Sequence, residues 1–169
     1  MTFIVTSPGQ VIRSGIVAGV LSGLVFTIFQ LAMTQVLVGD ALGYLRIVSS
    51  IVLGPESLAP AYPLNVAIAV GILIRLSLAT GFGVIFSVIL TLSGQTQTSQ
   101  LLIVLYGTAY GFALWIINFL TIAPLFFPQF TTVDQFWLGF VAHTFLYGTV
   151  LGVSYGWSQT VHRQRPIGQ

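Results

Sequence analysis

Residues 64–92 read LNVAIAVGILIRLSLATGFGVIFSVILTL, and this stretch decides the class of fold. Its only charged residue is Arg75, and no proline interrupts it. An α-helix needs roughly 20 apolar residues to cross the hydrocarbon core of a bilayer, and this stretch exceeds that length. We therefore expect a transmembrane helix here.

Three further apolar blocks of similar length occupy residues 14–39, 101–127 and 134–157. The chain of 169 residues is 56% hydrophobic and only 5% charged, whereas an ordinary soluble domain is about 25% charged. Such a composition cannot cover a water-soluble surface. The sequence thus predicts an all-α fold in which residues 1–169 form a single membrane domain, an integral membrane four-helix bundle.

The segments between the spans have their own patterns. Residues 41–53 (ALGYLRIVSSIVL) are apolar but too short to span a bilayer, which predicts a short interfacial helix between the first two spans. A helical wheel separates Leu45, Val48 and Val52 from Gly43, Arg46, Ser49 and Ser50. The prolines of residues 54–63 are expected to break the helix, after which the chain re-enters the bilayer. Residues 93–100 (SGQTQTSQ) are expected to form a polar turn. The capping pattern of residues 131–135 predicts the start of the fourth helix.

Arginine placement predicts the orientation of the bundle. Arg13, Arg163 and Arg165 flank the two chain ends, which an even number of spans brings to one side of the membrane. All three acids, Asp40, Glu56 and Asp134, fall on the opposite side together with Arg46. Since cytoplasmic ends retain positive charge, both termini are expected to face the cytoplasm.

Each predicted span carries one unusual polar residue at the same depth. Gln30, Arg75, Asn118 and His143 lie nine to eleven residues from the outer end of their spans, roughly 14–16 Å at the helical rise. A charged residue at a helix centre costs roughly 2.5 to 3.5 kcal/mol on insertion scales, so Arg75 is expected to face the bundle. Its expected partners are the side-chain oxygens of Asn118 and Gln30, helix carbonyls, or Glu56.

This polar layer has two interpretations. It either joins the four helices by hydrogen bonds, as polar residues commonly do in membranes, or binds a ligand such as an anionic lipid, a quinone head group or a group of a neighbouring subunit. His143 also admits a pigment or haem. A bis-histidine haem needs a second histidine at similar depth, and the only other one, His162, falls in the polar tail. No metal site and no covalently bound cofactor is expected.

Small residues predict close helix packing. Glycines recur every four residues in the first, third and fourth spans, where they let backbones approach. Most of them fall in the cytoplasmic half, so the bundle should be tight there and any cleft should open outward or sideways into the outer leaflet. These candidate packing residues are Gly15, Gly19, Gly23, Gly107, Gly111, Gly148, Gly152 and Gly156.

Several function classes are excluded or disfavoured by the sequence. There is no cysteine, which removes disulfides and thiolate metal sites, and five arginines without a lysine are too sparse for a nucleic-acid surface. Paired carboxylates, HExxH and Walker motifs are missing, so an enzyme is not expected. A single polar layer also lacks the broken helices and repeated halves of a transporter.

Residues 106–130 (YGTAYGFALWIINFLTIAPLFFPQF), residues 140–156 (FVAHTFLYGTVLGVSYG) and the loop of residues 51–60 (IVLGPESLAP) resemble a group of small four-span bacterial membrane proteins of unsettled function. Such proteins look like accessory subunits of electron-transfer assemblies such as alternative complex III. The resemblance implies the bacterial inner membrane, other membrane subunits and membrane lipid as partners, and quinone chemistry in neighbouring subunits.

The function expected from the sequence is therefore that of a non-catalytic accessory subunit of a respiratory or photosynthetic electron-transfer complex, holding lipid or quinone. The alternatives are a stand-alone lipid- or quinone-binding membrane protein, and a pigment-binding antenna protein that uses His143.

Overall fold

The computed structural model describes residues 7–131 and 133–163, and for Gln97, residues 133–135 and residues 160–163 it describes the backbone alone. It is 89% helical, and the described residues contain no strand. Four helical segments are long and apolar enough to cross a membrane, and one shorter apolar helix accompanies them. The predicted fold class, an all-α membrane bundle of four spans, is confirmed.

In chain order the elements alternate between long spans and short connections. Span 1 is α1 (Pro8–Val38), span 2 is α3 (Leu64–Leu92), span 3 is α4 (Gln100–Trp115) with η3 (Ile116–Ile122) and α5 (Ala123–Phe126), and span 4 is α6 (Val133–Val141) with η5 (Ala142–Thr149) and α7 (Val150–Arg163). The connections contain α2 (Gly43–Leu53), η1 (Pro55–Leu58), η2 (Gln95–Gln97) and η4 (Pro128–Phe130). The elements η3 and η5 are π-helical.

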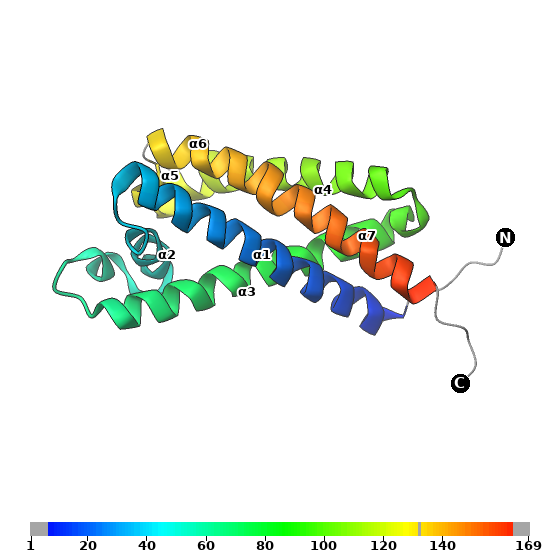
Figure 1. Cartoon of the computed structure of the whole chain (residues 1–169), viewed down its shortest axis with the longest axis horizontal. Helices are drawn as coiled ribbons and strands as arrows, with labels where there is room; N and C mark the ends of the chain where they lie inside the picture. Colours follow the sequence, from blue (N-terminus) through cyan, green and yellow to red (C-terminus); the bar gives the residue numbers. More distant parts are fainter. Residues whose placement is uncertain (1–6, 132, 164–169) are drawn as a thin grey trace.

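The spans run antiparallel, so the start of α1, the end of α7 and η2 share one end of the bundle, and α2 lies at the other (Figure 1). We call these the terminal end and the α2 end. α1 packs against α3 on one side and against span 4 on the other, and span 4 packs against α4. α3 packs much less closely on α4 and η3, so spans 2 and 3 are in closer contact with span 1 and span 4, respectively, than with each other.

Helix boundaries follow local capping more than charge. α1 begins at Pro8, before the predicted residue 14, because Ser7 and Gln10 form a capping box on its first turn. It ends at Gly39, whose φ of 77° suits glycine and stops the helix. Span 4 continues past the predicted residue 157 to Arg163, while Thr132 and the side chains of Asp134, His162, Arg163 and Arg165 lie outside the described residues.

The glycine stripes lie at two close helix contacts. A Cβ on Gly19 would stand 2.6 Å from the Ala79 carbonyl oxygen of α3, and one on Gly152 would stand 2.7 Å from that of Ile103 in α4. Such distances require glycine, because a methyl group would push the two backbones apart. Gly15 and Gly23 share the first contact and Gly107, Gly111 and Gly148 the second, whereas Gly156 meets the flexible side chain of Gln100.

The predicted short helix is present as α2, but the two sides of its helical wheel do not correspond to a buried side and an exposed side. Leu45, Val48, Ser49 and Ser50 are all buried, and Val52 is 63% exposed. A Cβ on Gly71 would collide with the Leu45 backbone, so α2 lies directly against α3. The two serines face the protein without cost because each hydroxyl donates to a carbonyl one turn earlier, Ser49 to Arg46 and Ser50 to Ile47.

Candidate functional site

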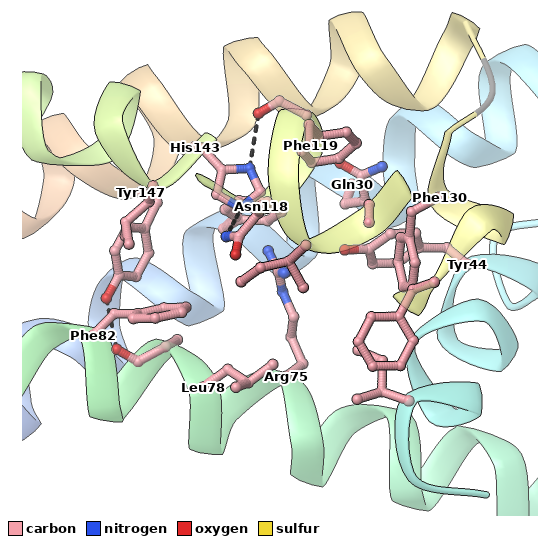
Figure 2. A pocket seen from close by; sticks show the side chains of 18 residues that line it. Gln30, Tyr44, Arg75, Leu78, Phe82, Asn118, Phe119, Phe130, His143 and Tyr147 are labelled. Carbon is pink, nitrogen blue, oxygen red and sulfur yellow. Dashed lines mark hydrogen bonds between the residues drawn. The ribbon is translucent and has the colours of Figure 1, made fainter. Parts of the chain in front are cut away.

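A cavity of ≈ 230 Å³ lies in the middle and α2-side part of the bundle. All four spans contribute to its wall, as do α2 and η4 (Figure 2). Aromatic rings dominate the wall, and a few polar side chains stand among them. A concave, largely apolar chamber with few polar groups has the usual character of a small-molecule site. Its phenylalanines are Phe26, Phe82, Phe119, Phe127 and Phe130.

The four polar residues that the sequence placed at one depth all line this cavity: Gln30, Arg75, Asn118 and His143. Each comes from a different span, and Figure 2 shows them converging on one space. Gln30 is only 2% exposed. The four residues that were predicted at one depth therefore line one site. Their ligand-binding role stays a prediction.

Arg75 contacts rings rather than acids. Its guanidinium carbon lies 3.4 Å from the centre of the Phe26 ring and 5.9 Å from that of Tyr44. Its Nε is buried without a hydrogen-bond partner, and no hydrogen bond or ion pair joins Arg75 to another described residue. The expected bonds to Asn118, Gln30, helix carbonyls or Glu56 are thus not formed, since the guanidinium lies against Phe26 and Glu56 is exposed in η1.

Tyr44 does not neutralise this charge. The residue lies in α2, outside the spans, and burial raises the pKa of its phenol although Arg75 acts in the opposite direction. A raised pKa keeps the hydroxyl protonated and uncharged at neutral pH. The described wall of the cavity consequently holds a cation and no anion.

His143 is held in one orientation by two hydrogen-bonding neighbours. Its Nδ1 lies 2.8 Å from the Gly139 carbonyl oxygen, which can only accept, so Nδ1 carries the proton. Its Nε2 then accepts from the Asn118 amide at 3.5 Å. The Phe26 ring meets the imidazole edge to face at 4.8 Å and the Phe119 ring does so at 5.7 Å. A pigment or haem could reach Nε2 only by displacing Asn118.

Both π-helical segments lie at this site, and each has a local cause. Pro124 has no N–H for the helix, and just before it the Ala123 N–H bonds to Asn118 five residues back. In η5 the His143 ring occupies the Gly139 carbonyl, which in an α-helix would accept from the backbone of His143 itself. The wider turns set the directions in which Asn118 and His143 project.

Hydroxyl groups close the cavity toward the terminal end. Tyr147 of η5 donates to the Ala79 carbonyl at 2.6 Å, and Tyr110 of α4 donates to the Phe82 carbonyl at 2.9 Å. Both carbonyls belong to α3, so spans 3 and 4 are attached to span 2 at this level. We call this the tyrosine floor.

The α2 end of the cavity is also covered. Gln129 donates to the Ser50 hydroxyl at 2.7 Å, which attaches η4 to α2. Phe130 packs against the buried cluster formed by Tyr44, Leu45 and Val48. These contacts form a roof over the site.

The side between spans 2 and 3 remains open. Leu78 of α3 and Ile122 of η3 both line the cavity and, at 42% and 37%, are the exposed residues of its described lining. These two residues mark the mouth of the cavity. It lies at the side of the bundle, between spans 2 and 3, rather than at either end.

Sequence reasoning missed the aromatic part of the site. Phe26, Tyr44 and Tyr147 touch or surround the polar groups but carry no signal in a chain that is 13% aromatic. One usable signal existed: Phe26 lies four residues before Gln30 and therefore on the same helix face.

Comparisons with protein-family models, curated proteins and solved structures found no match for this chain.

Proposed function

We propose that this protein is a non-catalytic membrane protein that binds a lipid-soluble molecule, with the polar head of that molecule among Arg75, Asn118 and His143. The observation that carries the proposal is the Arg75 guanidinium, which lines a cavity and has no hydrogen bond or ion pair to another described residue. A buried charge is costly unless it is paired, and a bound head group supplies the partner.

The competing interpretation, that the layer only joins helices, accounts for less of the geometry. Joining helices requires hydrogen bonds across spans, and Asn118 and His143 make one at a long distance of 3.5 Å. The most costly member, Arg75, makes none to the described residues. The tyrosine floor and the glycine contacts already join the spans without it.

Access to the site is from the bilayer. The roof and the tyrosine floor close both ends of the cavity, whereas its mouth lies between two apolar residues, Leu78 and Ile122. A molecule dissolved in lipid can enter there and leave its apolar tail in the bilayer. The described lining contains no carboxylate, serine or threonine, which favours binding over catalysis.

A role as an accessory subunit stays a prediction. The complex would be a bacterial respiratory or photosynthetic electron-transfer complex. A lipid- or quinone-binding site is compatible with such a role. Purification in mild detergent with identification of co-purifying membrane subunits by mass spectrometry tests it. Isolation as a single small particle would instead favour a stand-alone binding protein.

Narrowing the mouth tests the binding proposal. Leu78→Trp places a large ring at the mouth, and Leu73→Trp places the same ring on α3 at a position that is 64% exposed and outside the cavity lining. Each variant is purified in mild detergent, and its retained lipid-soluble molecules are extracted and quantified by mass spectrometry. We expect one molecule to be depleted in Leu78→Trp and kept in Leu73→Trp; equal content in both variants would contradict the proposal.

A further inference from the structure

We infer that the head group held in this cavity is a carboxylate at the end of a single-chain amphiphile, paired with Arg75. The inference rests on the proposed function and specifies its ligand. It distinguishes this ligand from the neutral quinone that the sequence left equally open.

Charge is the first reason. The described lining contains one cation, Arg75, and no anion, and the phenol of Tyr44 stays neutral. A neutral head group would add hydrogen bonds but leave the buried charge uncompensated, whereas an anion would compensate it. Since the described lining contains one cation, one negative charge is the matching number.

The geometry of the guanidinium is the second reason. Phe26 covers one face of the group at 3.4 Å, so its N–H donors point outward in the guanidinium plane. A planar carboxylate accepts two parallel hydrogen bonds from such an edge. Two of the polar neighbours do not compete for this edge, because the Asn118 amide nitrogen and both His143 nitrogens are engaged with each other and with Gly139.

The shape of the cavity selects a terminal head group. A phosphodiester also carries one charge, but its phosphate lies between two substituents and needs space on both sides. Here the roof closes one side through the bond between Gln129 and Ser50, and the tyrosine floor closes another. A carboxylate has a single substituent, and that chain can leave through the mouth between Leu78 and Ile122.

The test compares three probes on delipidated protein in non-ionic detergent: palmitate, methyl palmitate and a short-chain quinone. Methyl palmitate keeps the tail and removes the charge. We expect palmitate to bind and the other two to bind at least about tenfold more weakly. We also expect Arg75→Gln to reduce palmitate affinity about tenfold or more, and Arg13→Gln, an exposed position at the start of α1, to leave it unchanged.

The outcomes separate the two proposals. Equal binding of palmitate and its methyl ester, stronger binding of the quinone, or palmitate binding that is unaffected by Arg75→Gln would overturn the carboxylate and leave the binding function standing. Failure of all three probes together with no effect of Leu78→Trp on retained molecules would overturn both. If Arg75→Gln does not fold, the comparison of acid and ester on the unaltered protein still decides the matter.

Discussion

Arg75 places a positive charge inside the bundle, and among the described residues the contacts that stabilise this charge are those with the Phe26 and Tyr44 rings. A cation over an aromatic face gains about 2 kcal/mol when desolvated, which falls short of the cost of burying the charge. Without ligand, the residue should therefore destabilise the protein that carries it. A binding site can require a side chain that destabilises the protein without ligand. A layer that only joins helices does not require one.

Replacing this charge tests that view. Arg75→Met keeps much of the side-chain volume and removes the charge, so we expect the delipidated protein to become more stable by about 1 to 4 kcal/mol, as when buried ionic groups are replaced by apolar ones. Thermal unfolding in detergent measures the effect, with Arg13→Met at an exposed position as the control. A loss of stability would mean that Arg75 makes structural bonds, and would return the layer to a role in joining helices.

The pair of Asn118 and His143 should behave as a coupled unit. Their side chains share one hydrogen bond across spans 3 and 4, and such bonds in membranes contribute on average about 0.6 kcal/mol. We expect Asn118→Ala and His143→Ala to be non-additive by about this amount in unfolding experiments. Asn118→Ala combined with Arg13→Ala should be additive, and additivity in both pairs would show that the 3.5 Å contact carries no energy.

At the scale of the helices, the bundle has two regions: one where glycines allow close helix packing, and one at the cavity, where the π-helical segments lie. Glycine stripes bring α1 against α3 and α4 against α7 and η5. The two wider turns then begin at Ile116 and Ala142, at the level of the cavity. The tight packing positions the helices, and the wider turns direct polar groups into the space that remains.

A methyl group at the glycine contact should separate the helices. In Gly152→Ala the new Cβ would lie 2.7 Å from the Ile103 oxygen, and overpacking of this kind costs about 1 to 3 kcal/mol. Gly81→Ala is the matched control, because nothing lies within 4 Å of its Cβ and alanine favours the helix. We expect a lower unfolding temperature in detergent for Gly152→Ala alone; equal temperatures would show that α4 and α7 can move apart freely.

For the whole molecule, the property to be determined is which end of the bundle faces the cytoplasm. Arg13 is exposed at the terminal end, and the acids Asp40 and Glu56 are exposed at the α2 end. Basic residues concentrate in cytoplasmic segments, so we infer that the terminal end is cytoplasmic. With this orientation, the cavity lies in the middle and outer part of the bilayer.

The absence of cysteine makes the orientation simple to measure. Gly9→Cys introduces a thiol at the terminal end with nothing within 4 Å, and Glu56→Cys introduces one at an exposed position of the α2 end. We expect a membrane-impermeant maleimide to label Glu56→Cys in intact spheroplasts and Gly9→Cys only after the membrane is permeabilised. The reverse pattern would invert the assignment.

The spans and the depth of four polar residues were predictable, because both follow from position along a helix. Hydropathy locates a span to within a few residues, and the rise per residue converts sequence distance into depth. Residues 64–92 were predicted at the bounds that α3 has, and Gln30, Arg75, Asn118 and His143 were predicted at one level. The start of α1 was missed by six residues because its capping box was overlooked.

The partner of each side chain was decided only by the tertiary structure. Which group a side chain meets depends on how its helix is rotated and how close the next helix comes. Neither follows from hydropathy in a chain whose four spans are predominantly apolar. Packing placed Arg75 against Phe26 instead of an amide, and α2 lines the cavity through Tyr44 and Ile51. The π-helical turns then joined Asn118 to His143. The sequence by itself thus determined the spans and the depth of the polar groups, and packing determined that they surround a cavity in which Arg75 has no hydrogen bond or ion pair to another described residue.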